Sequence, residues 1–292
     1  MKRVFNYTCE IENITAKDYL LSKDYSKKCL SFLKLNNGLF INDNPAKMTE
    51  RLHLNDQIEV VFDEHEDNEM VVDTDIPLDI TYEDEDIIVV NKQAGLPVHP
   101  SFHNYTHNLA NALSYYYHQK NETYVNRCIT RLDGDTSGFV LLAKNLYSAA
   151  VLSKMMHEHQ IYKTYTAIVD GNFENLSGEI NKPIKRMNAN TIERMVDEDE
   201  GQEAITRYQV IKQIPGKSLL EIQTITGRTH QIRVHMAYIG HPLVGDWLYN
   251  KASKDLPRQR LHVSSLKFVH PVTKEEMSFH SPLPSDITIA GL

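Results

Sequence analysis

The sequence predicts an α+β protein in which a small N-terminal domain, residues 1–75, precedes a larger domain, residues 76–292. Segments with strand and helix patterns alternate in mixed order, without a regular βαβ rhythm or an internal repeat. A chain of 292 residues with 41% hydrophobic content can bury one large core and a small additional unit. Between residues 63 and 86 stand twelve acidic residues and no Lys or Arg, and we interpret this run as the domain boundary.

The composition argues against membrane and secreted classes. There is no apolar run of eighteen residues and no charged-then-apolar N-terminus, so neither a membrane span nor a signal peptide is expected. Three cysteines at unrelated spacings suit free thiols better than a disulfide framework. We therefore expect a cytoplasmic protein.

The net charge of −8 is misleading, because the acidic residues are unevenly spread. Of the 39 acidic residues, twelve lie in the run at residues 63–86 and five at residues 197–203, which leaves 22 against 31 Lys and Arg. We interpret the two acidic runs as a solvated linker and a solvated loop. The rest of the chain is basic, so a nucleic acid partner stays open.

The N-terminal region reads as a basic, helix-rich stretch, a turn at residues 36–38, a short strand at 39–43 and a closing strand at 57–62. This order resembles the small alpha-L RNA-binding module of ribosomal proteins and RNA-modifying enzymes. The alternative is an unrelated cap domain, because its basic residues could equally form a solvated helix face. These residues are Lys23, Lys27, Lys28 and Lys34.

The larger domain begins with an apolar strand at residues 87–90 and an amphipathic helix at 107–119. A strand at 139–144 leads into a helix for which Asn145 is the expected cap. The segment at 163–171 alternates, which places Tyr165 on the same face of a strand as Ala167 and Val169.

A later helix is predicted at residues 230–239, capped by Thr229 and stopped by Gly240. Ile232, Met236 and Ile239 give it a buried stripe. Arg233 lies about 100° around the helix from Ile232, at the edge of this stripe, so its guanidinium can reach into a cleft.

Metal and nucleotide sites find little support. His230 and His235 differ by five positions and His241 lies beyond the helix stop, which is a poor spacing for zinc ligands. The segment GRTHQIR lacks the lysine and the spacing of a P-loop. A Ser/His/Asp triad stays open, although Ser137 lacks the flanking-glycine elbow that exposes a nucleophilic serine. We expect no metal and no cofactor.

The chemical centre is therefore a carboxylate in RLDGDTSGFVLLAK, residues 131–144. Together with KTYTAIVDG, GQEAITRYQV, TGRTHQIRVHMAYIGHPLVGDWLY and RQRLHVSSLKFVHPVTKEEMSFHSPLP, this motif resembles the RluA-type RNA pseudouridine synthases over residues 78–284. The resemblance implies the pseudouridine synthase fold, with a mixed, mostly antiparallel central sheet and flanking helices and loops around an RNA-binding cleft. The implied reaction converts uridine in ribosomal or transfer RNA to pseudouridine.

The resemblance also implies roles for individual residues. Asp133 matches the catalytic aspartate, Arg233 the arginine expected to pair with it, and Tyr165 the tyrosine that packs on the flipped uracil. Arg131 matches the residue that enters the vacated base stack. The remaining residues of the implied RNA surface are Arg228, His230 and Gln231.

Two departures from the family pattern, Thr130 and Gln93, bear on RNA contacts and substrate subclass. We expect a monomer. Two other functions stay open from the residues: a non-catalytic RNA-binding protein that keeps the fold, and a glycosidase that uses Asp133 and Asp135 as a carboxylate pair.

Overall fold

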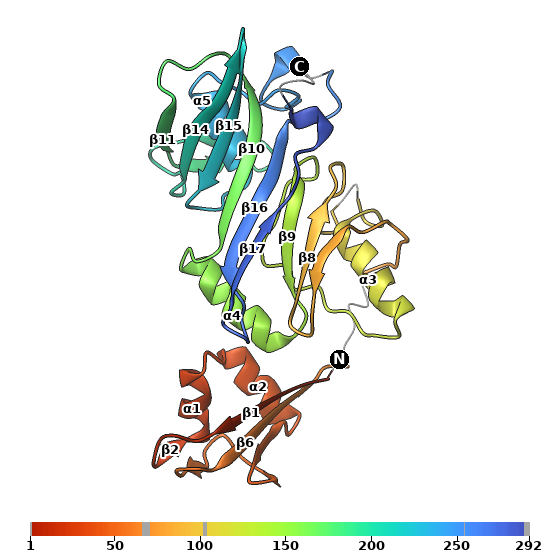
Figure 1. Cartoon of the computed structure of the whole chain (residues 1–292), viewed down its shortest axis with the longest axis vertical. Coiled ribbons are helices and arrows are strands. Elements are labelled where there is room, and N and C mark those ends of the chain that lie inside the picture. Colours follow the sequence, from red (N-terminus) through yellow and green to blue (C-terminus); the bar gives the residue numbers. More distant parts are fainter. Residues whose placement is uncertain (1, 66–70, 102–103, 254, 289–292) are drawn as a thin grey trace.

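The computed structural model describes residues 2–65, 71–101, 104–253 and 255–288. Its main feature is a nine-stranded sheet in which every pairing is antiparallel except that of β9 with β16 (Figure 1). In spatial order the strands are β11 (Ser177–Asn181), β14 (Ile205–Ile214), β15 (Lys217–Thr224), β10 (Tyr162–Asp170), β16 (Leu261–Val269), β9 (Ser137–Ala143), β8 (Ile87–Lys92) and β7 (Ile80–Glu83), with β17 (Glu276–His280) pairing β16. The predicted α+β class and mostly antiparallel central sheet are confirmed.

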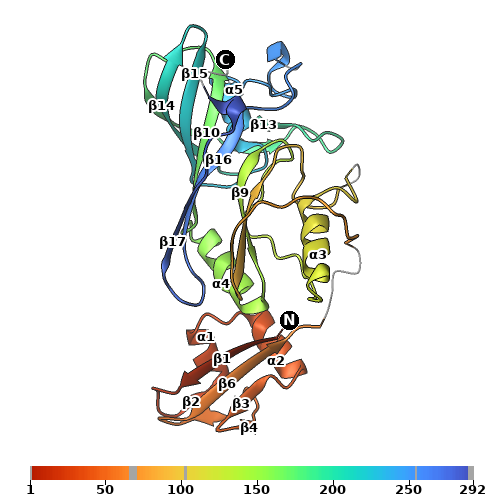
Figure 2. The same ribbon diagram turned by 45° about the vertical axis from the view of Figure 1, so that its right-hand side comes forward.

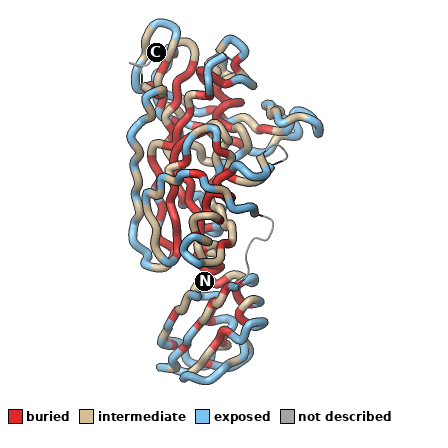
Figure 3. Tube along the Cα trace, turned by 90° about the vertical axis from the view of Figure 1, so that its right-hand side faces the viewer, coloured by how far each residue is buried: buried red, intermediate tan, exposed pale blue. Residues whose placement is uncertain are grey.

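Three helices flank this sheet: α3 (Leu109–Gln119), α4 (Leu146–His157) and α5 (Gln231–Tyr238). Asn145 caps α4 as predicted, since its side chain accepts a hydrogen bond from the backbone N–H of Ser148. The buried residues run the length of the sheet (Figure 3). None of the helices in the described ranges has the length and apolar character needed to cross a membrane.

The predicted cap of α5 is wrong. The cap is His230, not Thr229, and it has a left-handed backbone with φ of 58° and no side-chain cap bond. The turn before the helix is held instead by Gln231, whose side-chain oxygen accepts from the backbone N–H of Arg228. The helix also ends one residue earlier than expected, and Ile239 is only partly buried.

The N-terminal unit, residues 2–63, forms a second sheet of four strands below the first in Figure 1. The predicted helices and strands are present, but β1 was missed because only one of its seven side chains, Phe5, is buried and alternation is weak. The elements are β1 (Lys2–Thr8), β2 (Ile14–Thr15), α1 (Ala16–Ser22), α2 (Lys27–Leu35), β3 (Leu39–Ile41), β4 (Asn44–Pro45), β5 (Arg51–Leu52) and β6 (Gln57–Asp63).

This unit packs on the N-terminal end of α4 (Figure 2). The ring of Tyr147 lies 4.6 Å from that of Tyr25 and 4.8 Å from that of Phe5, between centroids. Arg3 donates two hydrogen bonds to Asp86, at 3.0 and 2.8 Å. An aromatic contact and a charged contact therefore join the two parts of the chain.

The acidic run is only in part the solvated linker that its composition suggested, since Asp73, Asp75 and Asp79 are exposed but its two ends are not. Glu64 and Asp86 are buried, and Glu64 accepts from the backbone N–H of Leu146 and from Arg127. Glu83 pairs with Lys144, and Asp84 with His270. These carboxylates meet hydrogen-bond donors that are distant in sequence, which composition alone cannot reveal. Residues 66–70 lie outside the described residues, and the boundary at residue 75 stays a prediction.

The single parallel pairing positions the loop that carries Asp133. Ser137 and Gly138 of β9 pair with residues of β16, and Gly138 has φ of +110°. A Cβ at Gly138 would lie 2.3 Å from the carbonyl oxygen of Val263. Only glycine fits this close approach, so the chain can pass from the Asp133 loop directly into the core of the sheet.

The Arg3–Asp86 contact yields a stability prediction. Replacing Arg3 by Met leaves the Asp86 carboxylate buried without a cation, and breaking such a pair costs about 3–5 kcal/mol when both groups are fully buried. Because Arg3 is partly exposed, we expect urea unfolding to give a loss of about 2–3 kcal/mol. Arg51→Met, at an exposed arginine bonded only to Asn13, is the control. A loss as small as in that control would contradict the anchoring role.

Candidate active site

A cleft of about 1020 Å³ opens on the large sheet. Its walls come from the segment after β8, the loop before β9, the end of α4, the start of β10 and the turn before α5. All seven residues predicted from the sequence line it: Arg131, Asp133, Tyr165, Arg228, His230, Gln231 and Arg233. The structure thus brings together residues that are up to 102 positions apart in the chain.

Arg233 is the centre of the cleft's electrostatics. Its guanidinium is buried and lies between two carboxylates, donating at 2.7 and 2.8 Å to Asp246 and at 3.2 Å to Asp133. Burial opposes the charge, but the bonds to Asp246 and the charge of Asp133 outweigh it and raise the pKa of Arg233. The arginine is therefore a fixed cation under Asp133.

Asp246 was missed by the sequence analysis. Its side chain is fully buried and also accepts from the backbone N–H groups of Leu248 and Tyr249. With both oxygens occupied, Asp246 holds two of the three guanidinium nitrogens and leaves the third for Asp133. A carboxylate in the apolar segment PLVGDWLY was the available signal, because such a group needs a buried partner.

His230 also lies near Asp133, with its Nε2 3.9 Å from the same carboxylate oxygen that Arg233 binds. Its Nδ1 lies 2.9 Å from the hydroxyl of Tyr249, and that hydroxyl also accepts from the backbone N–H of Arg194. Burial raises the pKa of Tyr249 to about 12, so the phenol keeps its proton and can donate it to Nδ1. We infer that the Nε2 of His230 then carries the hydrogen and faces the cleft.

His230 is neutral at physiological pH. Burial lowers its pKa to about 4, even though the charge of Asp133 acts in the opposite direction. Its left-handed backbone is uncommon for a non-glycine residue, and the residue lines the cleft. The cleft thus offers a neutral N–H donor beside a carboxylate.

The loop at residues 133–136, here called the carboxylate loop, is held by three donors. Lys92 donates at 3.0 Å to the carbonyl of Gly134, Arg258 at 3.2 Å to that of Asp135, and Gln259 at 2.8 Å to the hydroxyl of Thr136. Lys92 is almost completely buried, and this burial lowers its pKa to about 7. All three donors were missed, because they act on backbone or hydroxyl oxygens and form no motif with the loop.

Tyr165 forms part of the cleft floor. Its side chain is largely buried, and the register of β10 against β16 shifts between Thr164 and Tyr165. Such a bulge re-aims a side chain relative to a regular strand. The ammonium of Lys163 lies 5.5 Å from the ring centroid, so one face of the ring is close to a cation.

The other predicted residues differ in exposure and in how many of their hydrogen-bonding groups are already in use. Arg131 and Arg228 are exposed at the cleft rim, and Arg228 uses one nitrogen on the carbonyl of Glu203. Gln231 is buried, and its amide bonds Thr226, the backbone of Ile205 and Arg228, and Thr206. The side-chain amide of Gln231 is thus already hydrogen-bonded within the protein. A direct contact between Gln231 and RNA stays a prediction.

Two residues that the sequence analysis singled out, Thr130 and Ser137, are hydrogen-bonded to neighbouring residues in the structure. Thr130 is buried and its hydroxyl accepts from the backbone N–H of Leu141, so this departure from the family pattern sits behind the cleft wall. Ser137 lies 2.9 Å from Nδ1 of His262, but both are buried and neither lines the cleft.

One group in the described ranges has metal-like spacing: Asp84, Asp86 and His270. His270 accepts at Nδ1 from two backbone N–H groups, so its Nε2 hydrogen is free to donate to Asp84. Asp86 is engaged by Arg3. These contacts give the group a structural explanation, and none of its members lines the cleft.

The comparisons with known proteins agree with this geometry. Residues 86–238 match the family model described as RNA pseudouridylate synthase. An uncharacterised RNA pseudouridine synthase of Bacillus subtilis (strain 168), YjbO, is 37% identical over 94% of this chain and 97% of its own length. The ribosomal large subunit pseudouridine synthase D of Blochmanniella floridana is 35% identical, over 92% of this chain and 91% of its own.

Among solved structures, human RNA pseudouridylate synthase domain containing 1 matches with a TM-score of 0.59 and 26% identity, over 70% of this chain and 83% of its own. The family match spans half of this chain, and the two bacterial relatives extend the similarity over more than nine tenths of it. The chain therefore belongs to the RNA pseudouridylate synthase family and is an RNA pseudouridine synthase.

Proposed function

We propose that this enzyme isomerises specific uridines of ribosomal RNA, with Asp133 as the nucleophile or base. The observation that carries the proposal is the carboxylate of Asp133 in a cleft of about 1020 Å³, held by an arginine that Asp246 fixes from behind. The name of the relative from Blochmanniella floridana supports ribosomal RNA as the substrate. Transfer RNA is the alternative substrate. A cytoplasmic location and a monomeric state stay predictions.

The reaction needs a carboxylate and no external reactant. The bond between uracil N1 and ribose C1′ breaks, a bond between uracil C5 and C1′ forms, C5 loses a proton, and N1 gains one. Asp133 can capture the detached sugar or remove a proton from it, because a carboxylate serves as either nucleophile or base. Arg233 engages one oxygen of Asp133, so the other keeps its lone pairs for the ribose.

An ionised Asp133 must persist when RNA closes the cleft and excludes water. Burial alone would favour the protonated carboxyl group, and the neighbouring polyanion would do the same. The guanidinium of Arg233 offsets both effects at 3.2 Å. In our proposal Arg233 therefore keeps the nucleophile charged while RNA is bound.

The target base has to leave the RNA stack to reach Asp133, at a cost of a few kcal/mol. Exposed Arg131 at the rim can occupy the vacated stack with its planar guanidinium. The ring of Tyr165 offers a flat surface for the flipped uracil. In this proposal a residue at the rim, Arg131, replaces the base in the RNA stack, and a residue of the floor, Tyr165, receives the flipped base.

We assign His230 to the flipped nucleotide as a neutral hydrogen-bond donor. Negative charge develops on the uracil as its bond to the sugar breaks, and an oriented N–H stabilises such charge without the need to be a cation. Tyr249 sets the imidazole orientation through Nδ1, which directs Nε2 into the cleft.

Asp133→Asn should abolish pseudouridine formation, because the amide keeps the shape but loses charge and nucleophilicity. We expect less than about a hundredth of the wild-type rate, with RNA affinity within about threefold. The assay is mass-spectrometric pseudouridine counting after incubation with unmodified ribosomal RNA. Asp135→Asn, two residues away in the same loop, should stay active. An active Asp133→Asn enzyme would show that Asp133 is neither the nucleophile nor the base. A wild-type protein that binds ribosomal RNA but forms no pseudouridine in it would favour the non-catalytic RNA-binding alternative.

His230→Gln should retain more activity than His230→Asn. The glutamine amide places an N–H near the position of Nε2, whereas asparagine reaches only the position of Nδ1. We expect His230→Asn to lose about 100-fold in single-turnover rate, the usual effect of removing one oriented donor, and His230→Gln to lose less than tenfold. Asparagine tolerates the left-handed backbone better, so backbone strain predicts the reverse order. Equal or reversed rates would therefore contradict the donor role.

Lys92 should make stability depend on pH. Its pKa is about 7 in the folded chain against 10.5 for an ordinary lysine. Between these values the unfolded chain holds a proton that the folded chain has released, so the free energy of unfolding rises with pH. Relative to Lys92→Met, the wild type should thus gain stability from pH 7.5 to 9.5 in urea titrations. The same comparison with Lys267→Met, at an exposed lysine, should be flat. A flat difference for Lys92 would contradict its perturbed pKa.

A further inference from the structure

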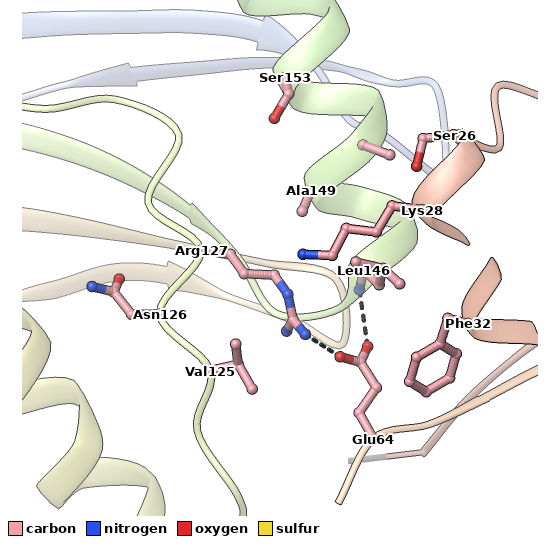
Figure 4. A pocket seen from close by; sticks show the side chains of 11 residues that line it. Ser26, Lys28, Phe32, Glu64, Val125, Asn126, Arg127, Leu146, Ala149 and Ser153 are labelled. Carbon is pink, nitrogen blue, oxygen red and sulfur yellow. Dashed lines mark hydrogen bonds and ion pairs between the residues drawn. The ribbon is translucent and has the colours of Figure 1, made fainter. Parts of the chain in front are cut away.

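A second cavity, of about 370 Å³, lies where the N-terminal unit meets α4 (Figure 4). One side is formed by Lys28 and Phe32 of α2, a second by residues 125–127, and a third by Ala149, Ala150 and Ser153 of α4. Nothing in the proposed reaction uses this cavity, and none of its lining residues lines the cleft around Asp133.

The same two elements line both cavities. Ala149, Ala150 and Ser153 of α4 face the second cavity, while Met156 and His157, one or two turns further along, face the cleft. Positions 149, 153 and 156 follow the spacing of one helix face. On the opposite side, residues 125–127 line the second cavity and the chain continues directly into the cleft wall at Cys128 and Ile129. The two cavities therefore follow each other along α4, and we call the path along this helix from one cavity to the other the groove.

The length of this groove follows from its two walls. From Ala149 to His157 the helix advances about 12 Å, at about 1.5 Å per residue. From Arg127 to Asp133 an extended chain reaches about 20 Å at most. A stacked nucleic acid strand advances about 3.4 Å per nucleotide, so the groove fits about four to six nucleotides.

The charges at the two ends suit a polyanion. At the cleft end stand Lys163 and the exposed Arg131. At the far end the side chain of Lys28 points into the cavity in Figure 4. Arg127 is engaged by Glu64, and Lys154 by Asp24, whereas the ion pairs within the described ranges leave Lys28 unpaired. Lys28 is therefore the cation at this end that is ready to meet a phosphate.

We propose that the RNA strand flanking the target uridine lies in this groove and that Lys28 binds one of its phosphates, about four to six nucleotides from the flipped base. The inference rests on the proposed function, because it takes RNA as the substrate. It goes further by giving the strand a path and by distinguishing Lys28 from the other basic residues of the N-terminal unit. Lys27 precedes Lys28 on α2 and Lys34 follows in its last turn, yet neither lines the cavity.

The test compares full-length Lys28→Gln with Lys27→Gln and Lys34→Gln, which remove the same charge from the same helix. Binding of oligouridylates of 3 and 12 nucleotides is measured between 50 and 300 mM salt. For the 12-mer, Lys28→Gln should weaken binding about three- to tenfold and reduce the slope of log affinity against log salt by about 0.7, the value for one contact to a single strand. For the 3-mer, which cannot span the groove, the affinity should be unchanged. The two control variants should change the 12-mer slope by less than half as much.

An unchanged 12-mer slope in folded Lys28→Gln protein, an equal change in Lys27→Gln, or an equal loss for the 3-mer would each overturn the proposed path. If wild-type enzyme modifies no ribosomal RNA, the proposed function fails on its own, and the oligouridylate slopes still decide whether a strand occupies the groove.

Discussion

The site depends on one shared guanidinium. Arg233 is buried and would be costly there without compensation, but Asp246 supplies a two-pronged partner that is itself held by two backbone N–H groups. The arginine is thus fixed by a group other than Asp133. Its remaining nitrogen reaches Asp133, which is partly exposed and free to meet a substrate. In the proposed reaction, Asp246 holds the cation while Asp133 changes its bonding partners, so Arg233 can stay in place.

The rest of the fold brings the two ends of this interaction together. Arg233 sits on α5, whose first turn is fixed by Gln231 and Thr226, while Asp133 sits on a loop fixed by Lys92, Arg258 and Gln259. The parallel pairing of β9 with β16 carries that loop into the middle of the sheet. The side chains of Asp133 and Arg233 therefore rest on segments that are themselves hydrogen-bonded by several other residues, as preorganised sites require.

Local pattern and resemblance were enough to predict the α+β class, most helices, the cap of α4 by Asn145, and seven of the residues that line the cleft. Contacts between positions that are distant in the sequence could not be predicted in this way. Asp246 and Tyr249 occur in an apolar segment whose partners lie earlier in the chain, and Lys92 ends a strand 42 residues before the carbonyl that it holds. The acidic run was misread for the same reason, since Glu64 and Asp86 are buried against Arg127 and Arg3, 63 and 83 positions away. Local sequence patterns predict individual helices and strands, whereas buried charge pairs depend on residues that become neighbours only in the folded chain.

The most direct test of this account is the single-turnover rate of Asp246→Asn on saturating ribosomal RNA. The substitution keeps both Asp133 and Arg233 in the chain but weakens the hold on the guanidinium, which can then shift. A displacement of about 1 Å at a reacting group costs about 100-fold in rate. The account predicts such a loss, with RNA affinity within about threefold of wild type. A folded Asp246→Asn enzyme that reacts at the wild-type rate would contradict it, because Arg233 would then need no fixed partner to support Asp133.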